Sequence, residues 1–267
     1  MTILSGDQIG AVNQLLRDVA RDIVMPRFQN LSSEDVKEKA ADDLVTIADQ
    51  ESEERLAERL VHILKGSTVV GEEACAADPS VQDRIGDGAV WIIDPIDGTG
   101  NFAAGRAPFG LMVALAVDGD VEAGWMFDPL GNRMCHAVRH QGAFIDGERV
   151  HSQGSGADIP VAGISLLFMD QDKRKRTIER ANGRLTMVDI PRCAAEQYPR
   201  VVLGQNDLAL FERTLPWDHA PGVLFLTEAG GAARRADGSP YRVTDKRTGM
   251  LAAATPALWD RGAEILF

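Results

Sequence analysis

The sequence predicts an α+β fold in which helices are stacked against more than one sheet. Three observations predict it: two amphipathic helical patterns in the first 65 residues, a run of short strand-like segments over residues 109–150, and an alternation of strands and helices from residue 161 onward. Apolar residues make up 45% of the 267, which is enough to bury a core in one large domain or two smaller lobes.

The helical patterns of the first part have clear start and stop signals. Residues 6–25 carry apolar side chains at helical spacing, with Ser5 opening a capping box and Pro26 placed as a stop. A second pattern runs from about residue 47 to residue 65, and Gly66 ends it. We expect both helices to bury one apolar face.

Short apolar segments predict strands in both halves. In the first half these are residues 68–70 and 89–93, followed by an antiparallel meander of residues 109–117, 121–127, 133–138 and 143–145. In the second half strands near residues 161–167, 185–188 and 208–211 alternate with helices at 172–181, after Ala194, at 218–229 and at 256–266. The best boundary lies at residues 150–158, which predicts an N-terminal lobe of residues 1–152 and a C-terminal lobe of residues 153–267.

The charge of the chain restricts its partners. Forty Asp and Glu against 28 Lys and Arg give a formal net charge of −12. Such a chain repels nucleic-acid phosphates and anionic membranes, so neither is an expected partner. A small anionic substrate would need bound cations that reverse the local field.

Cysteine usage and the apolar runs indicate the compartment. Cys75, Cys135 and Cys193 are odd in number, widely spaced and form no C-x-x-C, which argues against a disulfide framework or a thiolate zinc site. The first residues lack a basic flank followed by an apolar run, and the longest apolar stretch, residues 111–117, is too short to span a bilayer. We expect a soluble, cytoplasmic protein.

The stretch from Trp91 to Phe102 carries the strongest chemical signal. An apolar strand delivers Asp94 and Asp97 into a turn, where Pro95 fixes one backbone angle and Gly98 permits unusual ones. Two carboxylates at a strand end suit a hard cation such as Mg²⁺. If a helix begins there, its N–H groups form an anion cradle beside the cations. An isolated Asp-Gly pair would be an ordinary turn, but the whole string favours a metal site.

Three further stretches place acidic side chains at the ends of elements. Glu72 follows a short apolar segment, Asp218 stands at the start of a helix, and Asp49 is the third residue of a helix that Thr46 caps. Taken singly, Glu72 reads as a solvated loop residue, Asp218 as a cap and the Thr46 segment as a helix start. Together, Glu72 and Asp218 offer oxygen ligands for a second metal.

These four stretches, in this order, make the chain resemble the inositol monophosphatase family of magnesium-dependent, lithium-sensitive phosphomonoesterases. The strings that carry the likeness are Asp43-Leu-Val-Thr-Ile-Ala-Asp49, Gly71-Glu-Glu73, Trp91 to Phe102, and Trp217-Asp218 with Gly222. The resemblance implies a layered αβαβα sandwich, hydrolysis of a small phosphorylated substrate, two or three Mg²⁺ per site and a homodimer.

By position, the resemblance assigns Glu72, Asp94 and the main-chain carbonyl of Ile96 to a first Mg²⁺. Asp94 would bridge to a second ion, held also by Asp97 and Asp218. This arrangement agrees with the needs of phosphomonoester hydrolysis, in which cations activate water and neutralise phosphoryl oxygens.

The resemblance also implies the catalytic and substrate-binding residues. Asp49 and Thr99 would orient and help deprotonate the attacking water, with Glu72 as a third catalytic residue. The amides of Gly98 and Thr99 would hold the phosphate. The full set of substrate-binding candidates is Gly98, Thr99, Arg192, Ala194, Glu212 and Asp218.

Two departures from the family pattern concern substrate choice. Members that act on inositol phosphates resemble one another in a Gly-(Ser/Thr)-Ala turn and a glutamate seven residues before the late metal aspartate. Here the turn reads Arg192-Cys193-Ala194, and Glu212 lies six residues before Asp218. Inositol monophosphate or a related polyol or sugar phosphate is the leading substrate. Histidinol phosphate, fructose 1,6-bisphosphate and adenosine 3′,5′-bisphosphate stay open, as does a regulatory or binding protein that keeps the fold.

The remaining polar features have structural interpretations that we prefer. His219 reads as a supporting or surface residue, and Cys193 as a small apolar one. Arg192 and Arg213 could bind a second anionic group, but solvated surface arginines are the default. The basic run at residues 173–176 reads as the exposed face of a helix.

Overall fold

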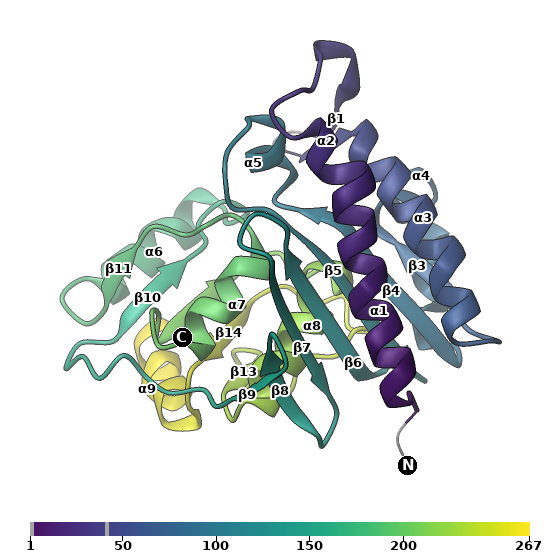
Figure 1. The fold of residues 1–267 in the computed structure, drawn as a ribbon. Helices are drawn as coiled ribbons and strands as arrows, with labels where there is room; N and C mark the ends of the chain where they lie inside the picture. The colour runs from purple at the N-terminus through teal and green to yellow at the C-terminus, as the bar shows by residue number, and fades with distance from the viewer. Residues whose placement is uncertain (1–2, 41–42) are drawn as a thin grey trace.

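The computed structural model describes residues 3–40 and 43–267, and these form layers in the order helix, sheet, helix, sheet, helix (Figure 1). The predicted α+β class and the αβαβα sandwich are therefore confirmed. Apolar side chains fill each space between neighbouring layers, because every layer is apolar on the face or faces that it turns inward.

The first helical layer contains α1 (Gly6–Val19) and α3 (Ile47–Ile63), which lie across one face of the first sheet (Figure 1). Ser5 forms the predicted capping box. The prediction that Pro26 stops the helix is wrong: a π-helical turn, Ala20–Val24, leads into α2 (Met25–Arg27). The π turn shifts the hydrogen bonding by one residue just before Pro26, which has no N–H to donate.

The first sheet has seven strands in the order β3-β4-β5-β6-β7-β8-β9. β3 runs parallel to β4, and the following strands form the predicted antiparallel meander. Their bounds are β3 (Thr68–Gly71), β4 (Ala89–Asp97), β5 (Gly110–Val117), β6 (Asp120–Asp128), β7 (Arg133–Val138), β8 (Gly142–Ile145) and β9 (Glu148–Val150).

Both faces of this sheet are covered, which explains why its central strands read as unbroken apolar runs. In β4, Trp91 and Ile93 pack against α1 and α3, while Val90 and Ile92 face the opposite way into the central layer. The alternation follows from the two-residue period of a strand.

The central layer consists of α7 (Ala194–Val202) and α8 (Pro216–Glu228), both from the second half of the chain. They pack between the first sheet and the second, so both halves contribute to one core. Gly222 of α8 lies against the ring of Tyr198, and an added Cβ there would be only 2.0 Å from the ring. The division into lobes at residues 152 and 153 stays a prediction.

The second sheet has five strands in the order β11-β10-β12-β14-β13, and two helices cover its outer face. β10 is parallel to β11 and β12, whereas β14 is antiparallel to β12 and β13. The bounds are β10 (Val161–Ile164), β11 (Thr186–Val188), β12 (Leu208–Phe211), β13 (Ala232–Arg234), β14 (Met250–Ala253), α6 (Gln171–Ala181) and α9 (Pro256–Leu266).

Several short elements were not predicted. β9, β13 and β14 have too few residues to show a period, and the same holds for the separate hairpin of β1 (Val36–Ala40) and β2 (Asp43–Thr46). The other unpredicted short helices are 3₁₀ turns at Ser33–Asp35 and Pro79–Gly86 and α4 (Glu72–Ala77), whereas α5 (Thr99–Ala103) lies where the sequence analysis considered a helix after Gly98. Among the described residues, no helix has the length and apolar character needed to cross a membrane.

Candidate active site

A cavity of about 480 Å³ opens where the end of β4 meets the starts of α5, α7 and α8. Ten of the predicted site residues line it, from Glu72 in the first half to Asp218 in the second. They are Glu72, Asp94, Ile96, Asp97, Gly98, Thr99, Arg192, Ala194, Glu212 and Asp218. The fold thus brings together segments that lie far apart in the sequence.

One side of the cavity, which we name the carboxylate wall, consists of Glu72, Asp94, Asp97 and Asp218. One oxygen atom from each of Glu72, Asp94 and Asp218 lies within 4.8 Å of the other two. Asp94 Oδ1 is buried and has no hydrogen-bond partner in the part of the chain that the structure describes. Burial raises the pKa of Asp94 well above its usual range, and the charges of Glu72 and Asp97 add to this effect. An oxygen-only group of this kind fits a hard divalent cation.

The path of β4 aims Asp94 and Asp97 at the cavity. The pairing of β4 with β5 shifts register between these residues, with Asp94 opposite Met112 and Asp97 opposite Gly110. Such an irregularity re-directs side chains at the end of a strand. Asp97 Oδ2 accepts a hydrogen bond of 2.6 Å from the N–H of Ala195, at the start of α7. Burial raises the pKa of Asp97 to about 6, although the Ala195 N–H opposes this rise.

Asp49 lies behind the cavity and contacts it through Thr99. Its Oδ2 accepts hydrogen bonds from the N–H (2.7 Å) and hydroxyl (2.5 Å) of Thr46, which confirms the predicted cap. Its Oδ1 is 3.2 Å from the Thr99 hydroxyl, which also donates to the carbonyl of Ile96 at 2.9 Å. Burial raises the pKa of Asp49 to about 7, against the lowering effect of the Thr46 hydrogen bonds. A carboxyl with this pKa can exchange a proton near neutrality.

Gly98 begins α5 in the left-handed region, with φ of 83°. A Cβ at this position would lie 3.1 Å from the carbonyl oxygen of Pro108 and 3.2 Å from Cys193 Cβ. Glycine is therefore required both by the angle and by the close approach of the neighbouring chain. The N–H groups of Thr99 and Gly100, the first two residues of α5, have no acceptor within the helix, and both residues line the cavity.

Glu53 is a supporting residue that the sequence analysis missed. It is only 7% exposed and accepts hydrogen bonds from the N–H groups of Glu73 (2.7 Å) and Ala74 (2.8 Å) at the start of α4. Gly71 leaves room for it, since a Cβ there would lie 2.2 Å from Glu53 Cδ. Burial raises its pKa to about 7. Its position four residues after Asp49, on the same face of α3, was the available signal.

The prediction that residues 173–176 form the exposed face of a helix holds for only part of this run. Lys173 is not simply solvated: its Nζ donates to Glu212 Oε2 at 2.6 Å, and the Glu212 side chain is 12% exposed. Arg174 donates to the carbonyl of Met169 at 3.0 Å. Lys175 and Arg176 are exposed as predicted. Glu212 therefore reaches the cavity as half of an ion pair.

The surroundings of His219 and Cys193 favour structural rather than catalytic roles for both side chains. His219 is 2% exposed, with Nδ1 2.8 Å from the hydroxyl of Tyr198 and Nε2 3.0 Å from the carbonyl of Arg213. Burial lowers its pKa to about 3, so the ring is neutral. Burial raises the pKa of the Cys193 thiol well above its usual range, which fits the apolar interpretation and argues against a nucleophile.

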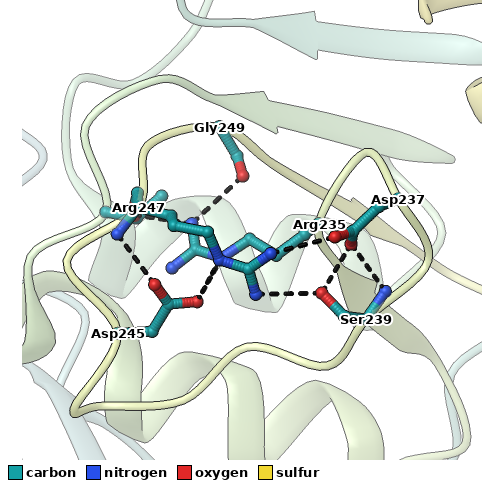
Figure 2. A network of polar contacts seen from close by, with 7 residues as sticks. Arg235, Asp237, Ser239, Asp245, Arg247 and Gly249 are labelled. Carbon is teal, nitrogen blue, oxygen red and sulfur yellow. Dashed lines mark hydrogen bonds and ion pairs between the residues drawn. The ribbon is translucent and has the colours of Figure 1, made fainter.

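A buried arginine that was also missed holds the loop before α8, which carries Glu212 and leads to Asp218. Arg235 is 2% exposed and donates to the hydroxyl of Thr214 at 2.9 Å. It also donates to the carbonyl of Gly249 at 3.0 Å (Figure 2). The N–H of Gly249 in turn donates to the carbonyl of Glu212 at 2.9 Å. At the surface of the same network, Arg247 contacts Asp237, Ser239 and Asp245.

Comparison with known proteins identifies the family to which this fold and cavity belong. Residues 7–266 match the sequence model of the Inositol monophosphatase family. The chain belongs to this family. It is 30% identical over 189 residues to a fructose-1,6-bisphosphatase/inositol-1-monophosphatase of Thermotoga maritima, covering 71% of this chain and 70% of the relative. It is also 30% identical over 225 residues to the Nus factor SuhB of Pasteurella multocida, covering 82% and 81%.

The solved structures agree with the sequence comparison. The structure of a Thermotoga maritima IMPase superposes with a TM-score of 0.78 at 25% identity, covering 97% of this chain and 98% of that one. The inositol monophosphatase family is metal-dependent, which agrees with a cavity walled by carboxylates. The predicted reaction class, phosphomonoester hydrolysis, is confirmed at the level of the family.

Proposed function

We propose that the chain hydrolyses a small polyol or sugar phosphomonoester with Mg²⁺ held on the carboxylate wall, and that inositol monophosphate is the leading substrate. The observation that carries the proposal is the buried carboxylate of Asp94, which has one oxygen within 4.8 Å of oxygen atoms of Glu72 and Asp218 and whose Oδ1 has no hydrogen-bond partner among the described residues. An ionised carboxylate oxygen in such a place needs a cation or a proton to offset its burial. The cavity volume of about 480 Å³ suits a small ester.

The ligand assignment follows the family resemblance, and the grouping of Glu72, Asp94 and Asp218 supports it. Glu72, Asp94 and the Ile96 carbonyl would hold one Mg²⁺, and Asp94 with Asp97 and Asp218 would hold another. Bound Mg²⁺ would neutralise phosphoryl oxygens and lower the pKa of a coordinated water.

The protein groups around the ions would bind and orient the reactants. The amides of Gly98 and Thr99 would donate to the phosphate from the start of α5. Asp49 and the Thr99 hydroxyl would form a relay that accepts a proton from the attacking water. The Asp49 pKa of about 7 suits this role, since a base works best near the operating pH. Glu53 would keep Glu72 in place through the first turn of α4.

The finer expectations belong to the same proposal. Family resemblance supports a homodimer, two or three Mg²⁺ per site and a cytoplasmic location. Histidinol phosphate, fructose 1,6-bisphosphate and adenosine 3′,5′-bisphosphate are the alternative substrates. The Thermotoga maritima relative is named for fructose 1,6-bisphosphate as well as inositol 1-phosphate, which keeps sugar bisphosphates in the comparison.

The test is phosphate release from inositol 1-phosphate and the three alternative esters, with Mg²⁺ and with chelator, in the parent and in Asp94→Asn. We expect turnover that requires Mg²⁺, and we expect Asp94→Asn to lose both turnover and the heat of Mg²⁺ binding in calorimetry. Asp87→Asn, an exposed aspartate before β4, is the matched control. An Asp94→Asn chain that turned over at the parent rate would refute the ligand assignment.

A second candidate is a binding or regulatory protein that keeps the fold. The observation in its favour is that the 30% identical relative from Pasteurella multocida is named a Nus factor. A folded chain that binds Mg²⁺ but releases no phosphate from the whole panel would favour this role. The complete set of candidate ligands in one cavity favours the enzyme.

A further inference from the structure

The lining of the cavity includes arginines as well as carboxylates. Arg106, Arg192 and Arg213 all line the cavity, from the loop after α5, the segment before α7 and the loop before α8. We name these three the arginine rim. Once cations neutralise the carboxylate wall, these positive side chains would add to a local field that attracts anions.

The three arginines of the rim differ in their contacts. Arg213 is engaged: its guanidinium lies 4.2 Å from the centre of the Phe168 ring, and its Nη2 is 3.8 Å from Asp218 Oδ2. The guanidinium groups of Arg106 and Arg192 are exposed and have no hydrogen bond or ion pair with any residue whose side chain the structure describes. Lys173 adds no further positive charge to the cavity, because its ammonium group forms an ion pair with Glu212.

Arg192 is held in a backbone conformation that an arginine does not favour. Its φ is 54°, in the left-handed region where glycine is the usual residue. The chain therefore places a cation on a backbone conformation that glycine usually occupies.

Hydrogen bonds and close contacts of its neighbours hold Arg192 beside the turn at Gly98. Asn101 of α5 donates to the carbonyl of Pro191 at 2.9 Å, and a Cβ added at Gly98 would lie 3.5 Å from the carbonyl oxygen of Arg192. On the other side, the Ala195 N–H donates to Asp97. The base of the Arg192 side chain is therefore fixed beside the turn that would hold the substrate phosphate.

We propose that Arg192 is a specificity-determining residue that binds a second anionic group, a phosphate or a carboxylate, on the phosphomonoester substrate. The inference rests on the proposed hydrolase function and adds to its substrate class esters that carry a second anionic group. A guanidinium matches both kinds of anion because it can donate two parallel hydrogen bonds. The exposed guanidinium and its fixed position beside Gly98 both favour this contact.

The test uses the full chain with Mg²⁺ and two pairs of esters that differ by one anionic group. Glycerol 3-phosphate and 3-phosphoglycerate differ by a carboxylate, and fructose 6-phosphate and fructose 1,6-bisphosphate differ by a phosphate. Arg192→Gly removes the guanidinium and suits the observed φ, so the variant should fold. Arg192→Lys retains the charge, and Arg176→Ala removes an equal charge from the exposed face of α6.

We expect Arg192→Gly to lower kcat/KM for the doubly anionic member of at least one pair by about tenfold to a hundredfold more than for its partner, mainly through KM. Arg192→Lys should recover part of the loss, and Arg176→Ala should show no difference within a pair. The pair that responds identifies the second group as phosphate or carboxylate. Equal losses on both members of both pairs, or no loss at all, would overturn the inference.

Failure of the proposed function is a separate outcome. A parent chain that releases phosphate from none of the four esters refutes the hydrolase proposal, and calorimetric binding of the same esters then decides the inference. Tighter binding of a doubly anionic ester that Arg192→Gly abolishes would support the role of Arg192. Binding that is indifferent to the substitution, or absent, would overturn it.

Discussion

The carboxylate wall and the arginine rim face the same cavity but are built in different ways. The wall residues are buried or half-buried, and Asp94 and Asp97 lie on a covered strand that is paired on both sides. The rim residues Arg106 and Arg192 are exposed and come from loops. Rigid elements position groups accurately, whereas loops can change without disturbing the core. The comparison suggests that the wall sets the reaction and the rim sets the substrate.

The largest expected effect comes from the wall. Asp97→Asn removes a charge while keeping the size of the side chain, so the fold should persist. We expect kcat to fall by at least about a hundredfold to a thousandfold, the range for losing one main electrostatic contact in a catalytic site. Turnover and the melting temperature of the same samples provide the measurement. Parent-level turnover of a folded Asp97→Asn chain would remove Asp97 from the wall.

A smaller effect, on Mg²⁺ affinity, is expected from a change at Glu53, which lies behind the carboxylate wall. Glu53→Gln keeps the side-chain volume but weakens the two hydrogen bonds that hold the first turn of α4 and thereby Glu72. Residues that support metal ligands typically contribute tenfold to a hundredfold, so we expect about that loss in Mg²⁺ affinity. The measurement is the Mg²⁺ dependence of turnover. Glu54→Gln, an exposed neighbour on α3, is the control, and equal behaviour of the two variants would contradict the role of Glu53.

The smallest effect is a pH dependence of stability to which Asp97, Asp49 and Glu53 should contribute. In the metal-free chain the pKa values of these groups are about 6, about 7 and about 7. In the unfolded chain such carboxyls titrate near pH 4. Between these values the three groups bind more protons in the folded chain than in the unfolded chain, so their contribution to the free energy of unfolding falls as the pH rises from about 4 to about 7.

Bound Mg²⁺ should offset the part of this loss that comes from Asp97, because the cation stabilises the ionised carboxylate in place of a proton. We therefore expect the rise in melting temperature caused by Mg²⁺ to be several degrees larger near pH 7.5 than near pH 5, at low salt. Thermal melts with Mg²⁺ and with chelator give the measurement. The same rise at both pH values would mean that Asp97 does not bind the ion.

The sequence could predict those parts of the site that are local. Residues 91–102 are contiguous, so the strand, the turn and the glycine that begins α5 could be recognised together. Thr46 and Asp49 form a cap within one turn of helix, and their hydrogen bonds agree with that prediction. Glu53 lies on the same face of that helix, but it accepts hydrogen bonds from backbone N–H groups of another helix. Every residue except proline has such an N–H group, so the sequence does not indicate which of them Glu53 contacts.

The sequence by itself determined the apolar periods, the caps, the acidic metal turn and, through its resemblance, the family. The tertiary structure decided which distant groups meet: Glu72 with Asp218, Lys173 with Glu212, and Arg235 with the loop before α8. It also decided that Arg192 keeps a glycine conformation. The physical reason is that periods and turns depend on neighbours along the chain, whereas contacts between charges depend on how the layers pack.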